Sequence, residues 1–386
     1  MSTIKVQNIQ HTASSTNAIA LASDGTCIAN ITNNLSNRRL TINGAMTISQ
    51  RGTTSTTSGY GSVDRFRVQH DGTDEAPTQS QVDVASGTTP YTSGFRKALR
   101  ITNGNQTSGA GATDAIHYEY YAEAQDIANS GWNYTSASSF ITLQFWIKSS
   151  VAQNFQGRIR TRQGTSQNYA FETGSLSADT WTKITKTIPG NSNLQFDNDT
   201  AKNFQIDIYA FYGTDRTDNS VSLDTWAAYA LGTQTKDNTS TWYTTNDATL
   251  EITGVQLEVG SVATDFEHRS YAQELQLCKR YYQKIISSGL YGFMATYHTS
   301  SRVQGTINLP VEMRTTPTLE QVSGSDYYRI YGSGTADGFT AFTGLTASNS
   351  RVATPYVDSG VSGTAGHAGT IYGNNASSNI ALSAEL

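Results

Sequence analysis

The chain has 386 residues, enough for two or three domains that each bury a core of their own. Charged residues make up 15% of it and apolar residues 37%, and both shares are low for a globular protein. A net charge of −5 excludes the basic surface that nucleic-acid-binding proteins need, so we expect no nucleic acid partner. The composition favours a β-rich structural or binding protein over a metabolic enzyme.

Signals for export, membrane insertion and metal or disulfide frameworks are weak. The first twenty residues contain one Lys and no continuous apolar segment, so we expect no signal peptide. The longest clear apolar run, 226–231, is too short to cross a membrane. Cys27 and Cys278 are too few for a disulfide framework or a closed zinc site. We therefore expect two free thiols in a protein made in a reducing cytosol.

Residues 1–59 are rich in Thr, Ser and Asn and hold only short apolar islands. This pattern predicts an extended arm with a few short strands, which needs a partner surface to bury its apolar side chains. The segment 52–58 (GTTSTTS) is typical of a linker.

Residues 60–268 are predicted to form one β-sandwich, because short alternating segments are separated by Gly, Asn and Asp clusters. In the clearest strand, 140–148, one face carries Ile141, Leu143, Phe145 and Ile147, and the other carries Thr142, Gln144, Trp146 and Lys148. The alternation changes phase at Gly254, which predicts a β-bulge there. No helical pattern interrupts these strands, so we expect antiparallel pairing and an all-β fold.

Residues 269–288 carry the strong helix signal of the chain. Ser270 and Gln273 have the spacing of a capping box. A heptad-like apolar pattern follows, and we expect either packing on the chain's own sandwich or an oligomer seam. The candidate seam consists of Tyr271, Leu275, Cys278, Tyr282 and Ile285.

Residues 289–386 are predicted to form a small second β-domain, rich in Gly, Ser and Thr. The candidate strands are 302–309, 327–331, 351–357 and 380–386.

Catalytic and metal motifs are absent from the sequence. The six histidines occur singly, and no nucleophile elbow, phosphate-binding loop or zinc motif is present. Two acidic groups, one with Asp71, Asp74 and Glu75 and one with Asp197, Asp199 and Asp207, are most simply solvated turns. A loop stabilised by a bound calcium ion is the second interpretation, and the pair of catalytic carboxylates of a glycosidase is the third. We predict no catalytic residues, no metal ligands and no cofactor, apart from a possible structural calcium ion.

A binding face is easier to support. Trp146 shares its side of the strand with polar residues, three arginines alternate along a neighbouring strand, and two aromatic residues alternate with the apolar set at 204–208. Rings together with hydrogen-bonding side chains suit a sugar, whose faces are apolar and whose edges carry hydroxyls. Burial of this face by the arm or by another subunit is the alternative. The candidate glycan-binding residues are Trp146, Arg158, Arg160, Arg162, Tyr209 and Phe211.

Several segments resemble known families. FITLQFWIKS (140–149), DTWTKIT (179–185) and ITGVQLEVG (252–260) resemble the jelly-roll sandwiches of carbohydrate-binding modules. A closer resemblance, to tail-fibre-like virion structural proteins of marine tailed bacteriophages, covers residues 1 to 285. It is carried by GTCIANITNNLSNRRLTINGAM, SGYGSVDRF, ASGTTPYTSGFRKALRITNGNQT and VQLEVGSVATDFEHRSYAQELQLCKRYYQK.

The resemblance implies a virion structural protein, made in the host cytoplasm, that forms a homotrimer and contacts other virion proteins through its N-terminal arm. It supplies no catalytic set. Our first hypothesis is a tail fibre or appendage that attaches the particle to a host cell-surface glycan or protein, with no membrane insertion. A capsid or neck decoration protein with a stabilising role is the alternative, and a polysaccharide depolymerase is a weaker one.

Overall fold

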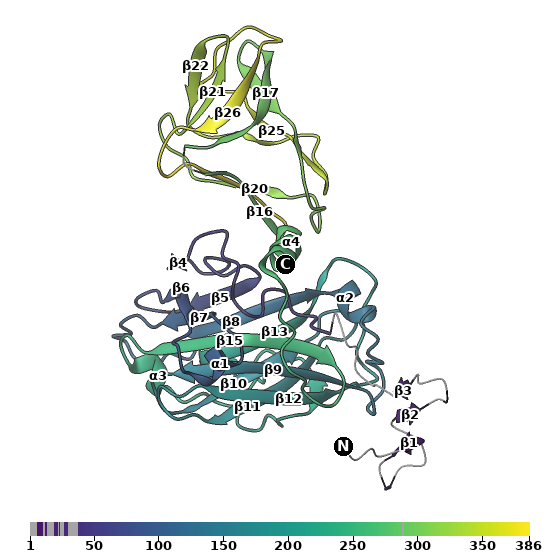
Figure 1. Cartoon of the computed structure of the whole chain (residues 1–386). Helices are drawn as coiled ribbons and strands as arrows, with labels where there is room; N and C mark the ends of the chain where they lie inside the picture. The colour runs from purple at the N-terminus through teal and green to yellow at the C-terminus, as the bar shows by residue number, and fades with distance from the viewer. Residues whose placement is uncertain are drawn as a thin grey trace.

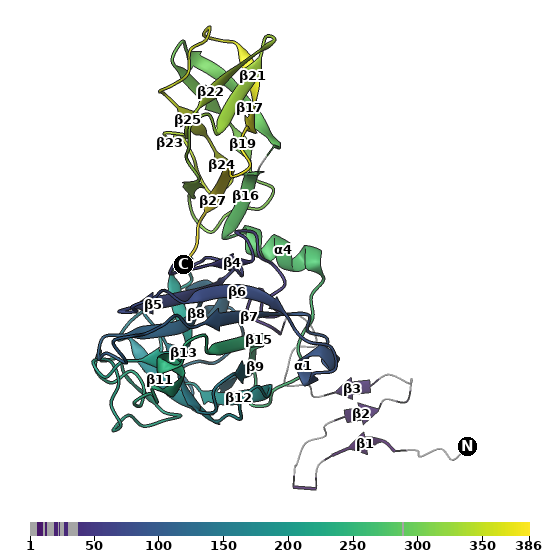
Figure 2. The same cartoon turned by 90° about the vertical axis from the view of Figure 1, so that its left-hand side faces the viewer.

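The computed structural model describes residues 6–10, 12–13, 19–21, 23, 27–29, 38–287 and 289–386. They form a large β-sandwich, a smaller β-domain stacked on one end of it, and a small N-terminal sheet beside it (Figure 1). Helix α4 lies at the junction of the two larger parts (Figure 2). The predicted all-β class with a jelly-roll sandwich is confirmed. No helix among the described residues has the length and apolar character of a membrane span.

The sandwich consists of two antiparallel six-stranded sheets. The first sheet has the order β14 (Trp226–Ala228), β11 (Gln167–Ser175), β10 (Asn154–Arg160), β13 (Lys202–Tyr212), β8 (Ala115–Glu123) and β5 (Phe66–Asp71). The second has the order β12 (Thr182–Pro189), β9 (Phe140–Ser149), β15 (Thr249–Val259), β7 (Lys97–Thr102), β6 (Thr78–Asp83) and β4 (Thr54–Ser55). We call them the first sheet and the second sheet below.

Alternation along the strands builds the core between the sheets. Every second residue of β9, from Ile141 to Ile147, is fully buried in one cluster with Phe204, Ile206 and Ile208 of β13. Each such side chain contributes about 1.5–3 kcal/mol when it leaves water. The residues in between point to the outer faces of the sandwich.

The predicted bulge at Gly254 is confirmed. The pairing of β15 with β9 shifts register between Thr253 and Gln256, and Gly254 has φ +66°. A Cβ at this position would lie 2.7 Å from the Phe95 ring. A left-handed backbone and a close neighbour therefore both require glycine here.

The N-terminal segment divides into two parts. β1 (Asn8–Ile9), β2 (Ile19–Leu21) and β3 (Cys27–Ala29) form a small antiparallel sheet, and the other residues of 1–37 lie outside the described part of the chain. Residues 38–59 were predicted to belong to an extended arm and its linker, but they are part of the sandwich. Met46 and Ile48 are buried, and β4 pairs with β6.

Short helices occur where none was predicted. Single-turn helices α1 (Thr89–Thr92), α2 (Ala124–Ala128) and α3 (Thr241–Thr244) lie between strands of the sandwich. They are too short to give an apolar period of their own, so the sequence pattern does not reveal them.

Helix α4 (Tyr271–Lys279) begins at the predicted capping box, where Ser270 Oγ accepts the Gln273 N–H and the Gln273 side chain accepts the Ser270 N–H. The prediction that the helix continues to residue 285 is wrong. The chain turns at Arg280 and enters strand β16 (Tyr282–Ser287), which pairs with β27 near the C-terminal end. The apolar residues at 282 and 285 keep the spacing of a heptad, but a register shift between Lys284 and Ile286 lets this segment form a strand, and pairing with β27 decides between the two.

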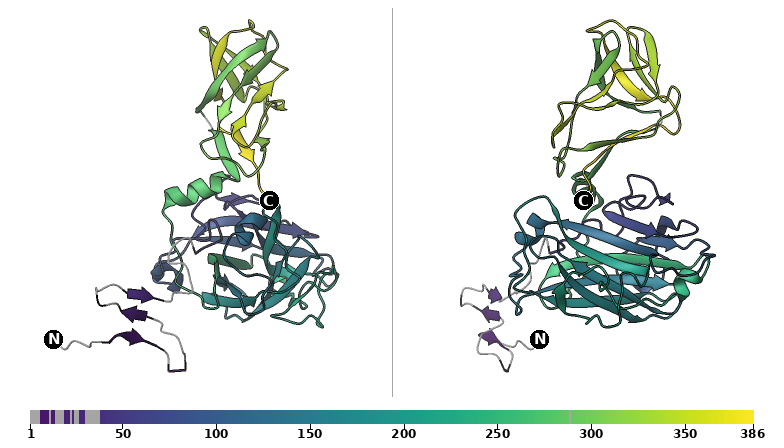
Figure 3. Two further views of the ribbon diagram at one scale, coloured as in Figure 1. Left: turned by 90° about the vertical axis from the view of Figure 1, so that its right-hand side faces the viewer. Right: turned by 180° about the vertical axis from the view of Figure 1, so that it is seen from behind.

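The C-terminal domain is built from three antiparallel sheets around its own core (Figure 3). One sheet comprises β16, β27 (Asn379–Ser383) and β20 (Thr318–Gln321). The largest has the order β22 (Thr335–Phe339), β21 (Tyr328–Gly332), β26 (Ala368–Gly373), β17 (Tyr291–Thr299), β18 (Arg302–Gly305), β25 (Pro355–Val357) and β23 (Gly344–Leu345). β19 (Ile307–Asn308) and β24 (Val352–Ala353) form a pair. The four predicted strand regions all contain strands.

The end of the chain ties the two domains together. Glu385 forms ion pairs with Arg65, at 2.6 Å, and with Arg51, at 3.1 Å, both from the sandwich. Arg314 donates to the Glu385 carbonyl, at 2.8 Å, and to the Thr200 carbonyl of the sandwich, at 2.9 Å. Since Arg65 is fully buried, loss of its carboxylate partner would leave an uncompensated charge.

Candidate functional site

The predicted binding face is split between the two outer faces of the sandwich. Trp146 lies on β9 of the second sheet, whereas Arg158 and Arg160 on β10 and Tyr209 on β13 belong to the first sheet, with Arg162 just beyond β10. The prediction that these residues share one surface is therefore wrong. Alternation assigns each residue to a side of its own strand, but it does not say which sheet the strand joins.

Trp146 is covered by the chain itself. It belongs to a packed cluster with Phe95, Trp181 and Phe266 on the outer face of the second sheet. Neighbouring polar residues are also covered, since Gln144 Nε2 donates to the Thr264 carbonyl at 2.6 Å. Trp146 is therefore partly buried, packed against Phe95, Trp181 and Phe266 of the same chain.

Phe211 points into the sandwich core, and its assignment to the outer surface is wrong. The pairing of β13 with β8 shifts register between Tyr209 and Phe211, which reverses the alternation. Phe211 is 5% exposed and its ring lies 4.5 Å from that of Tyr243.

The outer face of the first sheet carries a groove of about 350 Å³. Its floor comes from β8, β10 and β13, and one wall comes from the long segment 213–237, which brings Tyr229 and Gln234 over the sheet. The residues that line the groove are Ser58, Gln69, His70, Asp71, Ala115, His117, Glu119, Arg158, Arg160, Arg162, Gln205, Tyr212, Arg216, Tyr229 and Gln234.

Strand register explains the floor of the groove. Arg158 lies opposite Asp207, Asp207 opposite Glu119, and Glu119 opposite Arg67. Directly opposed residues on one face of a sheet are near enough to interact, so this row places two carboxylates between two guanidinium groups. Arg158 Nε lies 2.5 Å from Asp207 Oδ2, and Arg67 Nη1 lies 2.9 Å from Glu119 Oε2.

Neutral side chains connect the two carboxylates. Gln205 Nε2 donates to Glu119 Oε1 at 3.1 Å and to Asp207 Oδ1 at 2.8 Å. The Tyr209 hydroxyl donates to Asp207 Oδ2 at 3.0 Å, and Arg158 also bonds the Gln234 side-chain oxygen. The predicted site residue Tyr209 is itself fully buried, so it supports the floor instead of facing a ligand.

The charge state of Glu119 follows from its surroundings. Burial alone would raise its pKa, but the hydrogen bond and charge of His117 and the charges of Arg67 and Arg158 outweigh burial and bring the pKa to about 2. Glu119 is therefore ionised at all ordinary pH values and acts as a hydrogen-bond acceptor.

The rim of the groove combines aromatic rings with guanidinium groups. The Arg160 guanidinium carbon lies 3.5 Å from the centroid of the Tyr229 ring. Arg162 Nη2 donates to Gln205 Oε1 at 2.6 Å, and its guanidinium lies 5.5 Å from the Tyr121 ring. These contacts hold the long side chains in place, which lowers the entropy cost of binding a ligand.

Three floor residues, His117, Glu119 and Asp207, present ligand atoms within 4.8 Å of one another, close enough to share a metal ion. The donor groups around them do not suit a cation, however. Arg158 already occupies Asp207, and the Gln205 amide donates protons to both carboxylates. A metal ion here would have to displace a guanidinium and an amide, so we assign none.

The two acidic groups considered for calcium serve the folding of loops. Asp74 accepts hydrogen bonds from the Ser108 N–H at 2.6 Å and from its hydroxyl, and Glu75 accepts the Asn105 N–H at 2.7 Å. Asp199 accepts the Ala201 N–H at 3.1 Å, whereas Asp207 belongs to the groove floor. These contacts match the simple reading of acidic turns.

The candidate seam residues do not form one continuous stripe. Leu275 and Cys278 of α4 pack on Ile42 and Ile48 of the same chain. The Cys278 thiol is free and buried, and burial raises its pKa. Tyr282 and Ile285 lie on β16. Tyr271 alone among the five is widely exposed, at 64%.

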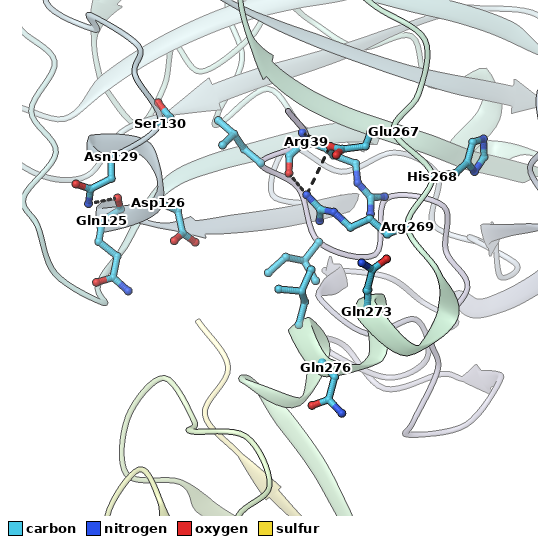
Figure 4. Close-up of a pocket in the computed structure, with 13 residues that line it drawn as sticks. Arg39, Gln125, Asp126, Asn129, Ser130, Glu267, His268, Arg269, Gln273 and Gln276 are labelled. Atoms are coloured by element: carbon cyan, nitrogen blue, oxygen red, sulfur yellow. Dashed lines mark hydrogen bonds and ion pairs between the residues drawn. The ribbon is translucent and has the colours of Figure 1, made fainter. Parts of the chain in front are cut away.

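A second and larger cavity, of about 940 Å³, lies between α4 and the sandwich (Figure 4). In its wall the Arg39 backbone N–H donates to Glu267 Oε2 at 2.8 Å, and the Arg39 guanidinium pairs with Glu274. Burial, and then the charge of Glu123, raises the pKa of Asp126 in its wall to about 6. We assign no ligand to this cavity.

Sequence reasoning found the three arginines but missed Glu119, His117, Gln205 and Tyr229. The polar alternation of β8 and β13 was a usable signal, because these two long central strands carry bulky polar groups at most of their outward positions. Tyr229 gave no signal, since it lies in an irregular segment that reaches the groove only through the fold.

Comparisons with known proteins give distant structural likenesses. No family model and no curated protein matches the chain. The N-terminal cellulose-binding domain of a Cellulomonas fimi glucanase is 11% identical, with a TM-score of 0.26, over 56% of this chain and 99% of that one. A putative sugar-binding protein from Bacteroides thetaiotaomicron is also 11% identical, with a TM-score of 0.29, over 58% of this chain and 100% of that one.

A phage protein is also among the similar structures. The enzymatically active domain of tailspike protein 4 of bacteriophage CBA120 is 10% identical, with a TM-score of 0.29. The match covers 57% of this chain but only 21% of that one. At scores this low, none of these likenesses carries an argument about function.

Proposed function

We propose that the chain is a non-catalytic glycan-binding protein and that the sugar occupies the groove on the first sheet. The observation that carries this proposal is the contrast between the two outer faces. The central strands β9 and β15 of the second sheet are covered by residues 264–267, whereas the first sheet keeps a groove whose polar floor is hydrogen-bonded in advance and whose rim presents an aromatic ring.

The lining suits a sugar better than an apolar ligand. Tyr229 offers its ring for the C–H side of a pyranose, and Gln69, Arg160 and Arg162 offer hydrogen-bonding groups for its hydroxyl edge. Because the floor residues hold one another in place, few side chains need to be ordered when a ligand binds.

The state of the carboxylates supports a binding role over hydrolysis. Glycosidases need one carboxylic acid that is protonated near neutral pH and a second carboxylate that is free to attack or to activate water. Glu119 has a pKa of about 2, and Asp207 is held by Arg158, Gln205 and Tyr209. Neither group is free for such a step.

The proposed setting is a virion, and the sequence resemblance to tail-fibre-like proteins supports it. In this setting the chain would be a homotrimeric fibre or appendage anchored through its N-terminal region, and several weak glycan contacts would add up to firm attachment. A decoration protein of the capsid or neck is the alternative.

Light scattering should give three times the mass of one chain. Particles without the protein should lose adsorption in the first case and mechanical stability in the second.

The glycan-binding proposal is tested by a matched pair of variants. Tyr229→Ala removes the ring under Arg160. Tyr91→Ala removes an equivalent ring on the other side of the sandwich, where Arg96 stacks at 3.9 Å. On immobilised cell-surface polysaccharides, wild type and Tyr91→Ala should bind and Tyr229→Ala should bind at least tenfold more weakly, with no sugar released. Equal binding by both variants, or release of oligosaccharides, would contradict the proposal.

A further inference from the structure

Positive charge at the groove is only partly neutralised by the protein. Arg158 is paired with Asp207, and Arg67 is paired with Glu119. Arg160 and Arg162, in contrast, form no ion pair with a carboxylate in the described part of the chain. Arg160 Nε donates to Ser166 Oγ at 3.2 Å, and Arg162 bonds the neutral Gln205 and Tyr121 side chains. The chain as a whole is acidic, with a net charge of −5, so this is a local excess.

A third unneutralised cation lies beside them. Lys202 Nζ lies 5.1 Å from the Tyr121 ring, and the guanidinium groups of Arg162 and Arg67 lie 5.5 and 5.7 Å from the same ring. Burial, followed by the repulsion of Arg162, lowers the pKa of both Arg160 and Lys202. Like charges gathered at a half-buried rim weaken the fold unless an anion joins them.

Unused hydrogen-bonding groups point to the same conclusion. Arg162 Nε is buried without a partner, and so is Nδ1 of His117, a residue that lines the groove and is only 8% exposed. Buried polar atoms are nearly always paired, so groups that lack a partner in the described chain call for one from a ligand. An oxyanion accepts hydrogen bonds from several donors at once.

We propose that the glycan bound in this groove is acidic, and that Arg160 and Arg162 hold its carboxylate or sulfate group. This inference rests on the proposed glycan-binding function. A guanidinium presents two parallel N–H groups that match the oxygens of a carboxylate or a sulfate. Arg160 stacks on the Tyr229 ring, which fixes the guanidinium and leaves its N–H edge available to such an oxyanion. Tyr229 then contacts the sugar ring while the arginines select for its charge.

The test uses the intact chain and three probes of similar length: an oligogalacturonate, the same oligosaccharide with its carboxyl groups reduced to alcohols, and a sulfated galactan oligosaccharide. A panel of acidic and neutral polysaccharides in affinity gels accompanies them. At least one acidic probe should bind tenfold or more tightly than the reduced one, and the two acidic probes distinguish carboxylate from sulfate. Binding should weaken as the salt concentration rises.

Variants connect the selectivity to the two arginines. The double variant R160Q/R162Q should lower affinity for the acidic probe by about ten- to a hundredfold, since each lost charge-assisted hydrogen bond costs roughly a factor of ten. The weak binding of the reduced probe should fall by a smaller factor, because the reduced probe has no acidic group for the two arginines to hold. The matched control R96Q removes a stacked arginine from the other side of the sandwich and should change neither affinity. R160K/R162K keeps the charge and should restore part of the binding, which separates charge loss from misfolding.

The outcomes separate this inference from the function on which it rests. Equal or tighter binding of neutral glycans, together with an unaffected R160Q/R162Q variant, would overturn the acidic ligand and leave glycan binding intact. Absence of binding to every polysaccharide by the folded wild-type chain would overturn both.

Discussion

The two outer faces of the sandwich have similar sequence patterns, but one is covered over its central strands and the other carries an open groove. Both sheets present bulky polar residues at alternate positions of their central strands: Gln144, Gln256 and Glu258 on the second sheet, and Glu119 and Gln205 on the first. On the second sheet these groups bond backbone and side chains of residues 264–267. On the first sheet they bond one another, and a groove stays open above them.

The difference shows that a polar strand face does not by itself indicate a solvent-exposed or ligand-binding surface. Satisfied hydrogen bonds are required on both faces, because each face excludes water from its central strands. Whether the partners come from a covering segment or from the same sheet is decided by residues far away in the sequence. The aromatic residue that looked most like a binding platform, Trp146, lies on the covered face.

The largest expected effect comes from the layer between the two faces. Phe211→Ala should lower the free energy of unfolding by about 3–5 kcal/mol, because it empties a buried site against Tyr243. Urea unfolding measures the loss. Tyr291→Ala, at a ring that is 67% exposed, is the control and should change stability by less than about 1 kcal/mol. If Phe211→Ala were as stable as the wild type, Phe211 would have to lie on the outer surface and not in the core.

Trp146→Ala probes the covered face. It should cost about 2–4 kcal/mol, since Trp146 packs with Phe95, Trp181 and Phe266. Glycan binding by the fraction that remains folded should be unchanged. Thermal unfolding and polysaccharide binding are measured for the variant and the wild type. The control variant Trp146→Phe should keep most of the stability. If Trp146→Ala spared the fold and abolished binding, the assignment of the two faces would be reversed.

Gly254→Ala tests the bulge that shapes the covered sheet. The change should cost about 2 kcal/mol, because alanine at φ +66° is strained and its Cβ would lie 2.7 Å from Phe95. Gly87→Ala places the same strain in open space and isolates the contribution of the close contact. Equal losses in the two variants would show that the contact with Phe95 contributes nothing.

The smallest effect concerns the floor of the open face. The folded-state pKa of Glu119, about 2, is below its ordinary value of 4.5, so its stabilisation is present above pH 4.5 and is lost as the pH falls toward 2. Between about pH 5 and pH 3.5 the loss should be about 1 kcal/mol. Unfolding curves of wild type and Glu119→Gln should therefore converge as the pH falls. A constant difference between them would contradict the depressed pKa.

Local patterns predicted much of the fold and little of the site. The alternation of β9, the bulge at Gly254 and the capping box at Ser270 each depend on a few neighbouring residues, and all are confirmed. The end of α4, the burial of Trp146 and the inward turn of Phe211 depend on pairing with β27, on covering segments and on a second bulge. The site is non-local in the same way, since Tyr229 and Arg160 meet only when the segment after β13 folds over the sheet.

A crystal structure of the intact chain with a bound oligosaccharide tests the central claim most directly. The sugar should lie in the groove on the first sheet, with one ring against Tyr229 and an acidic group within hydrogen-bond distance of Arg160 or Arg162. Density for the sugar on the C-terminal domain or beside Trp146, with the groove empty, would contradict the account.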